Sequence, residues 1–375
     1  MIYNESKYNK DWNENKLSDL GVFSRGKSKH RPRNDERLFA GGKYPFIQTG
    51  DIKDANLYIK NHTQEYGEFG LKQSKLWNKG TLCITIAANI AETAILPYPA
   101  CFPDSVVGFN AYESQSSEIF MYYVFEYIKA SIQNAASGSI QDNINIDYLT
   151  TLNFKIPEKN YQDMIVALLG AIDKKIISNN DINDNLEQQM HLIFEDMMAK
   201  ATNNKIKGEF IVAKSLTQVI TGKEDANFSV SNGKYKFFTC SNTPLHCDEY
   251  AFNSSSVLIA GNGDFNVKHY SGKFNAYQRT YVLSPQKEYY AILYLAALYR
   301  INSFKTGSSG SIVKFITKSD VENIPVFMPH DSKYLDELNK LVIMQEQNML
   351  ENELLVQLRD WLLPMLMNGQ ATISD

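Results

Sequence analysis

The sequence is poor in cysteine, has no long apolar run and carries little excess charge. Its cysteines are only four, at Cys83, Cys101, Cys240 and Cys247, and their irregular spacing excludes a disulfide-based framework. No N-terminal apolar segment resembles a signal peptide or a membrane span, so we expect a cytoplasmic protein without membrane contact. The formal net charge of −4 excludes a protein that grips nucleic acid over its whole surface, because phosphate affinity needs clustered Lys and Arg. Any contact with nucleic acid must therefore be local.

Recognisable catalytic motifs are also missing. Gly222-Lys223 lacks the upstream glycine and the following hydroxyl residue of a phosphate-binding loop. The "GNG" at 261–263 lacks the third glycine of a dinucleotide fingerprint and is better interpreted as a turn. Neither a Gly-x-Ser-x-Gly elbow nor the Asn-Pro-Pro-Tyr tetrapeptide of amino-methyltransferases occurs. What remains is the chemistry of binding.

A zinc site is one alternative in the second half. Cys240, His246 and Cys247 offer three ligand types, but no paired ligand spacing supports them. Reduced thiols beside a loop histidine are the preferred interpretation, and no metal is expected.

What the sequence does contain is a repeat. "SGSIQDNINIDYL" at 137–149 returns as "SGSIVKFITKSDV" at 309–321, and each copy runs on to a proline at the same spacing of 172 residues. Apolar positions are kept while polar ones drift, as expected of two domains that share a core but differ in surface. The matched pairs are Ile144 and Ile316, Leu149 and Val321, Leu152 and Ile324, Phe154 and Val326, and Ile156 and Met328. The length of 375 residues suits two domains of one fold.

Each copy consists mainly of predicted short strands interrupted by one helix. "TLCITIA" at 81–87 and "SVLIAG" at 256–261 are β-rich runs bounded by turn residues. The segments 116–132 and 287–301 carry apolar residues at helical spacing.

A long segment nearly free of Gly and Pro follows each copy, at about 160–201 and 332–367. Both have a heptad-like apolar pattern, which predicts two long coiled-coil helices. The first seam contains Ile165, Leu169, Ile172, Ile176, Leu186, Met190, Ile193 and Met197; the second contains Leu338, Val342, Met349, Leu355, Leu358 and Leu362. The alternative is that each helix packs only on its own domain.

Amides occupy the middle of both seams: Asn179 and Asn183 in the first, Gln345 and Asn352 in the second. If the helices pair antiparallel with 198 opposite 333, residue numbers sum to 531 along the seam, and Asn179 faces Asn352. Buried amides that meet there would set the register at some cost in stability.

These elements predict an α+β protein with a pseudo-twofold internal duplication. Two similar, mostly β domains at 1–157 and 203–330 would be separated by two long antiparallel coiled-coil helices, at 158–202 and 331–375, the latter including the C-terminal tail. At about 1.5 Å per residue, 35 to 40 helical residues span roughly 50 to 60 Å.

The segment "SRGKSKHRPR" at 24–33 is the strongest candidate for a binding site. Arg25, Lys27, Lys29, Arg31 and Arg33 occupy every second position, so an extended loop would present these cations on one side, with His30 among them. Five positive charges in ten residues of an acidic protein favour contact with phosphate over the alternative of a solvated loop.

The second copy has fewer charges. Its candidates are Lys223, Lys234, Lys236, Ser241 and Asn242, side chains that contact phosphate or read base edges but that also form turns.

The chain resembles the specificity (S) subunit of Type I restriction-modification systems over essentially its whole length. The resemblance rests on the plan of domain, helix, domain, helix and on three stretches: 24–52 around the basic loop, 137–157 before the first long helix, and "LRDWLLPMLMNGQ" at 358–370.

The resemblance implies a non-catalytic reader of double-stranded DNA in the bacterial cytoplasm. Each variable domain would be a target-recognition domain for one half of a split sequence, and the helices would set the gap and dock two methyltransferase subunits. S-adenosylmethionine, Mg and ATP would be bound by partners, the last by restriction subunits, with no cofactor in this chain.

For single residues, the resemblance extends to the basic loop and to Gln48 and Thr49, which follow a predicted strand and could reach bases. Ser137, Ser139, Ser309 and Ser311 are candidate DNA contacts, with a structural loop as the equal alternative.

Three alternatives stay open at this point. The chain could serve a related system in which methylation and cleavage are fused in one partner. It could be a two-lobed scaffold that binds only proteins through its coiled coil. It could also be an unrecognised enzyme that works from "GNGDF" at 261–265 or from the cysteine region.

Overall fold

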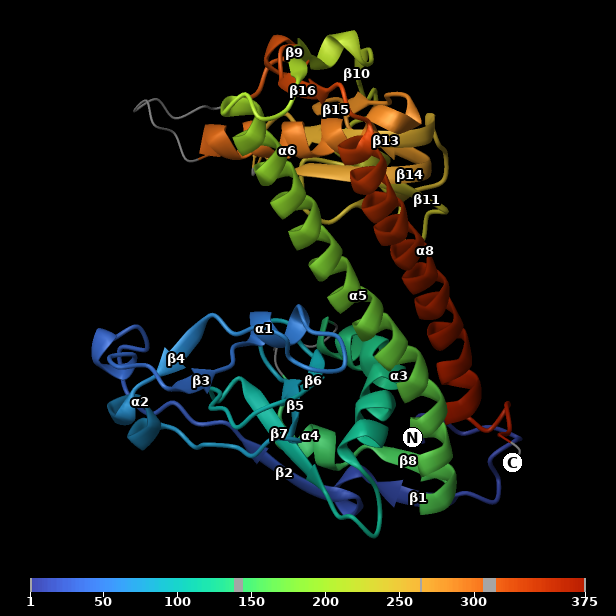
Figure 1. Cartoon of the computed structure of the whole chain (residues 1–375). Helices are drawn as coiled ribbons and strands as arrows, with labels where there is room; N and C mark the ends of the chain where they lie inside the picture. Colours follow the sequence, from blue (N-terminus) through green and yellow to red (C-terminus); the bar gives the residue numbers. More distant parts are fainter. Residues whose placement is uncertain (1, 138–143, 264, 306–314, 374–375) are drawn as a thin grey trace. The chain divides into compact units, whose positions relative to one another are not determined.

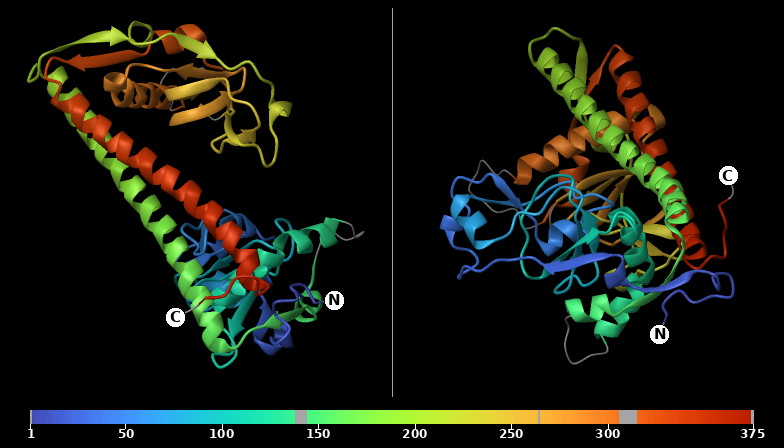
Figure 2. Two further views of the ribbon diagram at one scale, coloured as in Figure 1. Left: turned by 90° about the vertical axis from the view of Figure 1, so that its right-hand side faces the viewer. Right: turned by 90° about the horizontal axis from the view of Figure 1, so that it is seen from below.

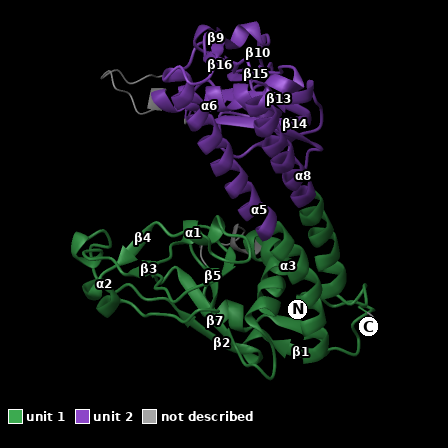
Figure 3. Cartoon of the chain, in the orientation of Figure 1, with its two compact units in different colours: residues 1–176, 354–375 green, residues 177–353 purple. Residues whose placement is uncertain are grey.

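The structure, a computed structural model, describes residues 2–137, 144–263, 265–305 and 315–373 (Figure 1). The chain forms two compact units: unit 1 is residues 1–176 together with 354–375, and unit 2 is residues 177–353 (Figure 3). The boundary falls inside the two long helices, so each unit holds one β-rich region and one end of each helix. The division into four segments at 157, 202 and 330 stays a prediction.

Unit 1 contains eight strands in the part of the chain that the structure describes. The strands are β1 Asn13–Lys16, β2 Gly21–Arg25, β3 Tyr44–Phe46, β4 Gln64–Tyr66, β5 Leu82–Thr85, β6 Thr93–Ile95, β7 Val106–Ala111 and β8 Asn153–Ile156. The helices are α1 Thr49–Lys53, α2 Glu68–Gln73, α3 Glu118–Ser137, α4 Ile146–Thr150, the first part of α5 Lys159–Thr202 and the last part of α8 Lys333–Met367, with 3-10 turns at Leu17–Asp19 and Glu36–Leu38.

The main sheet of unit 1 is antiparallel, with strand order β2-β7-β5-β6. Its central strand β5 is fully buried because both of its faces are covered. Helix α3 packs against β5, β6 and β7, while Cys83 of β5 packs into a cluster with Trp77 and Phe102. Two smaller pairs, β3 with β4 and β1 with β8, complete the unit.

Unit 2 is built from the remaining strands. These are β9 Gly208–Val212, β10 Val219–Thr221, β11 Tyr235–Phe238, β12 Leu245–Cys247, β13 Phe252–Ala260, β14 Val267–Ala276, β15 Thr280–Leu283 and β16 Pro325–Pro329. The helices are α6 Tyr290–Lys305, α7 Lys318–Glu322 and the adjoining parts of α5 and α8, with 3-10 turns at Ala213–Ser215, Ala226–Phe228 and Lys287–Tyr289. The main sheet has the order β10-β15-β13-β14-β11-β12, and α6 packs against β13 and β14.

The two units repeat one topology, which confirms the predicted duplication and the α+β class. The order β2-β7-β5-β6 in unit 1 matches β10-β15-β13-β14 in unit 2, and the pair β1 with β8 matches β9 with β16. The short helices α4 and α7 begin 172 residues apart, and each is capped by the preceding side chain: Asn145 accepts from the Tyr148 amide and Thr317 from the Asp320 amide.

The apolar positions that recur in the sequence are core positions in both units. Leu149 and Val321 are fully buried, as are Phe154 and Val326. Conservation of apolar character at these sites therefore reflects a shared core, in which side-chain volume is constrained.

Helices α5 and α8 run side by side in opposite directions within each unit (Figure 2). Helix α5 has 44 residues and α8 has 35, lengths of about 66 and 52 Å along their own axes. One seam assignment was wrong: Leu358 is 43% exposed, and Leu363, Leu366 and Met367 are buried in its place. The local packing on unit 1 selects a face that the heptad count alone did not identify. In the described part of the chain, no helix is both long and apolar enough to cross a membrane.

Candidate nucleic-acid interface

The basic loop continues from strand β2 of unit 1 as an extended segment held by its backbone. The amide of Gly26 donates to the Val106 carbonyl at 2.8 Å, that of Lys27 to Phe102 at 3.0 Å and that of Lys29 to Gln73 at 3.1 Å. Bonds to three separate carbonyls restrain the loop at Gly26, Lys27 and Lys29. The cations are therefore presented from a scaffold that is ordered before any ligand binds.

Burial alternates along this segment as the sequence pattern suggests. Gly26 and Ser28 face inward, and a Cβ added to Gly26 would lie 2.1 Å from the Pro103 carbonyl oxygen, so only glycine fits. Arg25, Lys27 and Lys29 are exposed, and their side chains have no hydrogen bond or ion pair within the described residues. These three cations are free to meet an anionic partner.

The other three cationic candidates of the loop are engaged with the protein itself. The Arg31 guanidinium donates to the carbonyls of Ser28 at 2.7 Å and His30 at 2.8 Å, and so braces its own loop. Arg33 forms an ion pair with Asp104 at 2.8 Å. The sequence pattern gave all five basic residues equal weight, whereas the structure separates a free set from a bracing set.

His30 belongs to the bracing set. Its Nε2 lies 2.7 Å from Asp35 Oδ2, and Arg37 donates to the same carboxylate at 2.6 Å. Hydrogen bonds from Arg37 and then His30 hold the pKa of Asp35 well below its ordinary value. The carboxylate thus stays ionised and continues to anchor the end of the loop.

Two further cations, Lys72 and Lys75, adjoin this loop and were missed in the sequence. The Ser74 hydroxyl donates to the Lys27 carbonyl at 2.7 Å, and this contact brings segment 72–75 beside the loop. Lys72 and Lys75 are exposed, and Lys75 Nζ lies 3.5 Å from the centroid of the Trp77 ring. No periodicity links them to the loop, which is some 45 residues away in sequence. We call Arg25, Lys27, Lys29, Lys72 and Lys75 the basic strip.

Gln48 immediately precedes helix α1, and Thr49 is the first residue of that helix. Gln48 Nε2 donates to Gln64 Oε1 at 2.9 Å, and its backbone amide donates to Asp51 Oδ2 at 2.8 Å. Both Gln48 and Thr49 are half-buried. Their role in contacting bases stays a prediction. Ser137 is the last residue of α3, and Ser139, Ser309 and Ser311 lie outside the described residues.

The candidates of unit 2 differ in how free they are. Lys223, Ser241 and Asn242 are exposed, as is Lys234, whose Nζ lies 5.5 Å from the centroid of the Tyr235 ring. Lys236, in contrast, forms an ion pair with Glu353 of α8 and lies over the Tyr270 ring. It therefore contributes less free positive charge than the sequence suggests.

Lys268 is a half-buried lysine of β14. Its Nζ donates to Asn266 Oδ1, and burial lowers its pKa to about 8. It carries a smaller average charge near neutral pH than an exposed lysine does.

The cysteine region of unit 2 has ordinary hydrogen bonding. Cys240 Sγ donates to the Arg279 carbonyl at 3.6 Å and Cys247 Sγ to the Glu249 carbonyl at 3.1 Å. All four cysteines are free, and within the described ranges no three His, Cys, Asp or Glu side chains gather as a metal site would require.

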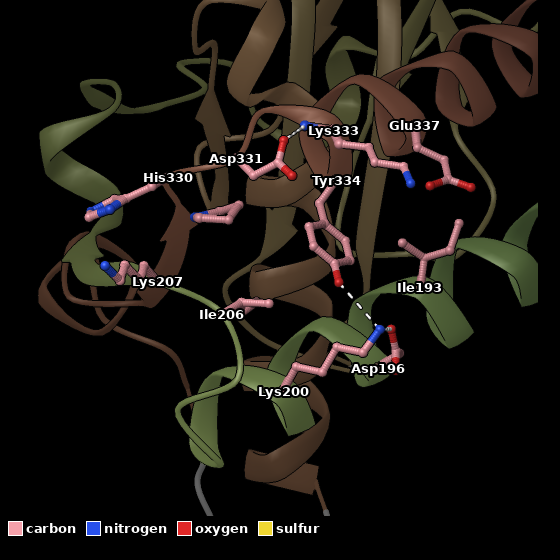
Figure 4. A pocket seen from close by; sticks show the side chains of 11 residues that line it. Ile193, Asp196, Lys200, Ile206, Lys207, His330, Asp331, Lys333, Tyr334 and Glu337 are labelled. Atoms are coloured by element: carbon pink, nitrogen blue, oxygen red, sulfur yellow. Dashed lines mark hydrogen bonds and ion pairs between the residues drawn. The ribbon is translucent and has the colours of Figure 1, made fainter.

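A pocket of about 550 Å³ opens in unit 2, where α5 ends and α8 begins (Figure 4). Lys200 on its wall is paired with Asp196 at 2.6 Å and lies 3.5 Å from the Tyr334 hydroxyl. Asp331 accepts from the Lys333 amide at 3.0 Å, which caps α8. The charged residues that line this cavity are of both signs, whereas those of the basic strip are all positive.

The helix-pairing residues lie together in unit 2. Asn179 Nδ2 donates to Asn352 Oδ1 at 2.9 Å and to Glu351 Oε2 at 2.7 Å. Asn183 Oδ1 accepts from Asn348 at 2.9 Å, and its carbonyl accepts from Gln345 at 3.3 Å. The seam of the two helices is thus polar in its middle.

A duplicated α+β plan, paired long helices and a strip of unpaired cations define a class of binding protein with two similar modules. The sequence matches the model of the Type I restriction modification DNA specificity domain twice, over residues 9–188 and 207–354. The chain therefore belongs to this family of DNA specificity domains, one copy matching in each half.

Individual relatives are similar to parts of the chain. The Escherichia coli Type I restriction enzyme EcoDI specificity subunit is 37% identical over 164 residues, which covers 42% of this chain and 37% of that protein. The Haemophilus influenzae HindI specificity subunit is 25% identical over 198 residues, covering 49% of this chain and 40% of that protein. The aligned chain thus spans well under half the length of these two relatives.

A solved structure shows the same fold over the full length. The S subunit of a Type I restriction-modification system from M. genitalium matches with a TM-score of 0.60 and 17% identity, and the match covers 100% of both chains.

Proposed function

We propose that this chain is the sequence-specific DNA-recognition subunit of a Type I restriction-modification complex. The observation that carries the proposal is the family match in each half of a duplicated fold. It is supported by the basic strip, whose side chains Arg25, Lys27 and Lys29 have no partner within the described residues. Ordered, unpaired cations on one surface suit the phosphate contacts that position a protein on DNA.

Each unit reads one half of a bipartite target in this proposal, and α5 and α8 set the gap between the halves. Two copies of one reader account for why the fold is duplicated while its surfaces differ. The unequal charge of the two units implies that unit 1 supplies more of the phosphate contacts and that unit 2 relies more on polar groups such as Ser241 and Asn242.

Catalysis belongs to partner subunits in the same proposal. S-adenosylmethionine would be bound by two methyltransferase subunits that methylate the DNA, and ATP would be bound by restriction subunits that cleave it, in the bacterial cytoplasm. Mg would likewise be bound by partner subunits. This chain would carry no cofactor.

Helix α8 offers a surface for such a partner in unit 1. Leu354, Leu358 and Trp361 are 58%, 43% and 58% exposed, and their spacing of four and three residues places them on one face of the helix. Large apolar side chains gathered on one helix face mark protein interaction sites. We propose that a methyltransferase subunit covers them. Replacing Leu354 and Trp361 with Glu should abolish co-purification with that subunit, whereas the same change at exposed Lys174 and Asp181 should not.

A methylome tests the whole proposal. The chain would be expressed with the methyltransferase subunit encoded beside it in a methylation-free bacterium, and modified bases would be located by sequencing. A single two-part motif with a fixed gap, lost when this chain is omitted, is the expected result. A stable complex that leaves the DNA unmodified would overturn the proposal in favour of a protein-binding scaffold.

A further inference from the structure

A buried histidine joins the sheet of unit 2 to its helices. His269 of strand β14 is 8% exposed, and its ring meets the edges of Tyr290 and Tyr294 of α6. Neither DNA contact nor helix pairing requires a histidine at this position. Its surroundings, however, specify which protons it carries.

The first ring nitrogen faces an oxygen. His269 Nε2 lies 2.9 Å from Gln345 Oε1 of α8. The orientation of that amide is set on its other side, because Gln345 Nε2 donates to the Asn183 carbonyl at 3.3 Å and to Glu187 Oε2 at 3.1 Å. A flipped amide would turn its oxygen toward two acceptors. His269 Nε2 must therefore carry a proton to make its hydrogen bond.

The second ring nitrogen also faces an oxygen. His269 Nδ1 lies 3.2 Å from Glu346 Oε1, and the side chains of this pair are 7% and 17% exposed. Glu346 Oε1 also accepts from the Tyr290 hydroxyl at 2.6 Å. A carboxylate gains a hydrogen bond from Nδ1 only when that nitrogen is protonated as well.

The remaining titratable groups around the ring reinforce this arrangement. Burial, with Glu346 as the next cause, raises the pKa of Tyr290, and burial with Glu187 raises that of Tyr294, so both tyrosines stay neutral donors. Tyr294 donates to Glu187 Oε1 at 2.9 Å. The charged groups that bond to the ring or to Gln345 are acids on α8 and α5, Glu346 and Glu187, and His191 lies beside Glu187 at 3.4 Å.

We propose that His269 connects the sheet of unit 2 to α8 as a doubly protonated imidazolium. Its contacts with Gln345 and Glu346 weaken when the ring loses a proton. The inference goes beyond DNA recognition and does not depend on it. A neutral imidazole has one N–H, so in either tautomer one lone pair would face a buried oxygen. Two buried acceptors that face each other with no proton between them destabilise the folded state.

The direction of the pH effect follows from the proton count. The state in which His269 contacts Gln345 and Glu346 holds one proton more than the state in which these contacts are broken. The contacts therefore weaken as pH rises, and the equilibrium constant for breaking them increases by up to about tenfold per pH unit. Because Asn183, Glu187 and Gln345 belong to the same network, loosening at His269 would also release the contact between the sheet and the paired helices.

Hydrogen exchange of the full-length protein, without DNA, tests the proposal. After correction for intrinsic exchange rates, protection of 267–276 and 333–352 should fall as pH is raised from about 5 to about 8, the range in which histidine side chains change charge. Glu346→Gln should flatten this profile, because an NH2 group in the place of Oε1 can donate to a neutral Nδ1 and to the Tyr290 hydroxyl, which can itself donate to the Ser256 carbonyl. His246→Gln, the matched control at an exposed histidine of unit 2, should retain the full pH dependence. An identical profile in Glu346→Gln and wild type would overturn the proposal.

A direct observation keeps the test independent of how well the variants fold. Nitrogen chemical shifts of His269 in the wild-type protein, followed over the same pH series, should show two protonated ring nitrogens at its acid end, and one proton should be lost as protection falls. One protonated and one unprotonated nitrogen throughout the series would overturn the proposal. Neither result bears on whether the chain recognises DNA, which the methylome decides separately.

Discussion

Asn179 of α5 and Asn352 of α8 are joined by a hydrogen bond of 2.9 Å in the middle of the helix pair. Asn179 is fully buried, and its Oδ1 has no hydrogen-bond partner in the described structure. The contact therefore stabilises the pair less than two apolar residues would, but it favours the observed register of α5 against α8. A helix pair shifted by one heptad would place Asn352 opposite Ile172 or Leu186, so this amide would be buried against an apolar side chain.

Cysteines placed at 179 and 352 should form a disulfide under mild oxidation, after Cys240, the most accessible native thiol, has been changed to Ser. The cross-link is read as a mobility shift on a non-reducing gel. Cysteines at exposed position 181 and at 352 are the matched control and should stay reduced. Equal cross-linking of both pairs would mean that the helices slide past one another.

Replacing Arg25, Lys27 and Lys29 with Ala should weaken DNA binding and lower the magnitude of the salt slope. Loss of three phosphate contacts changes the slope of log K against log salt by about 2.7, at about 0.9 per contact. Binding would be measured by fluorescence anisotropy in a salt series. The triple substitution of exposed Lys10, Lys16 and Lys174 controls for net charge, and a matching slope change there would remove the basic loop from the interface.

Replacing Arg31 and Arg33 with Ala should weaken binding with a smaller change in salt slope. Arg31 already bonds to loop carbonyls and Arg33 to Asp104, so their loss disturbs the shape of the loop more than it removes free charge. The same salt series measures this. A slope change as large as that of the first triple substitution would show that both arginines leave their protein partners to contact phosphate.

Arg359→Ala should destabilise unit 1 by about 3 kcal/mol, the loss typical when one partner of a buried ion pair is removed. Arg359 donates to Asp173 Oδ1 at 3.1 Å, and Asp173, which is 4% exposed, also accepts from Tyr123 at 2.6 Å. Urea unfolding gives the change in free energy. Asp360→Ala on the exposed side should cost less than about 0.5 kcal/mol. Equal losses in the two variants would contradict a role for the buried pair.

Stability should rise with pH between about 8 and 10.4 because of Lys268. Its folded-state pKa is about 8, and its unfolded value is about 10.4, so in this window the unfolded chain holds the extra proton. Lys268→Met should remove this rise and stabilise the protein at pH 7, where burial of the charge is costly. Thermal unfolding across pH measures both effects, with exposed Lys223→Met as the control. A rise that persists in Lys268→Met would assign it to another group.

The duplication, the two long helices and the polar middle of their seam could be predicted because each is local or periodic in sequence. A spacing of 172 residues that relates apolar positions reports a shared core, and heptads report a helix face. The alternation in the basic loop likewise follows from the two-residue period of an extended chain. Each of these properties depends on the spacing of residues along the chain.

Tertiary structure alone decided which charges are free and where they gather. Asp104 pairs with Arg33 across 71 residues of sequence, and Ser74 brings Lys72 and Lys75 to a loop that ended some 40 residues earlier. The exposed face of Leu358 and the two acceptors around His269 likewise depend on elements that meet only after folding. Periodicity records which side of a strand or helix a residue occupies, but the partner on that side is set by packing between distant segments. The sequence by itself therefore determined the plan of two repeated modules on paired helices, and the folded chain determined which surface of each module remains available to bind.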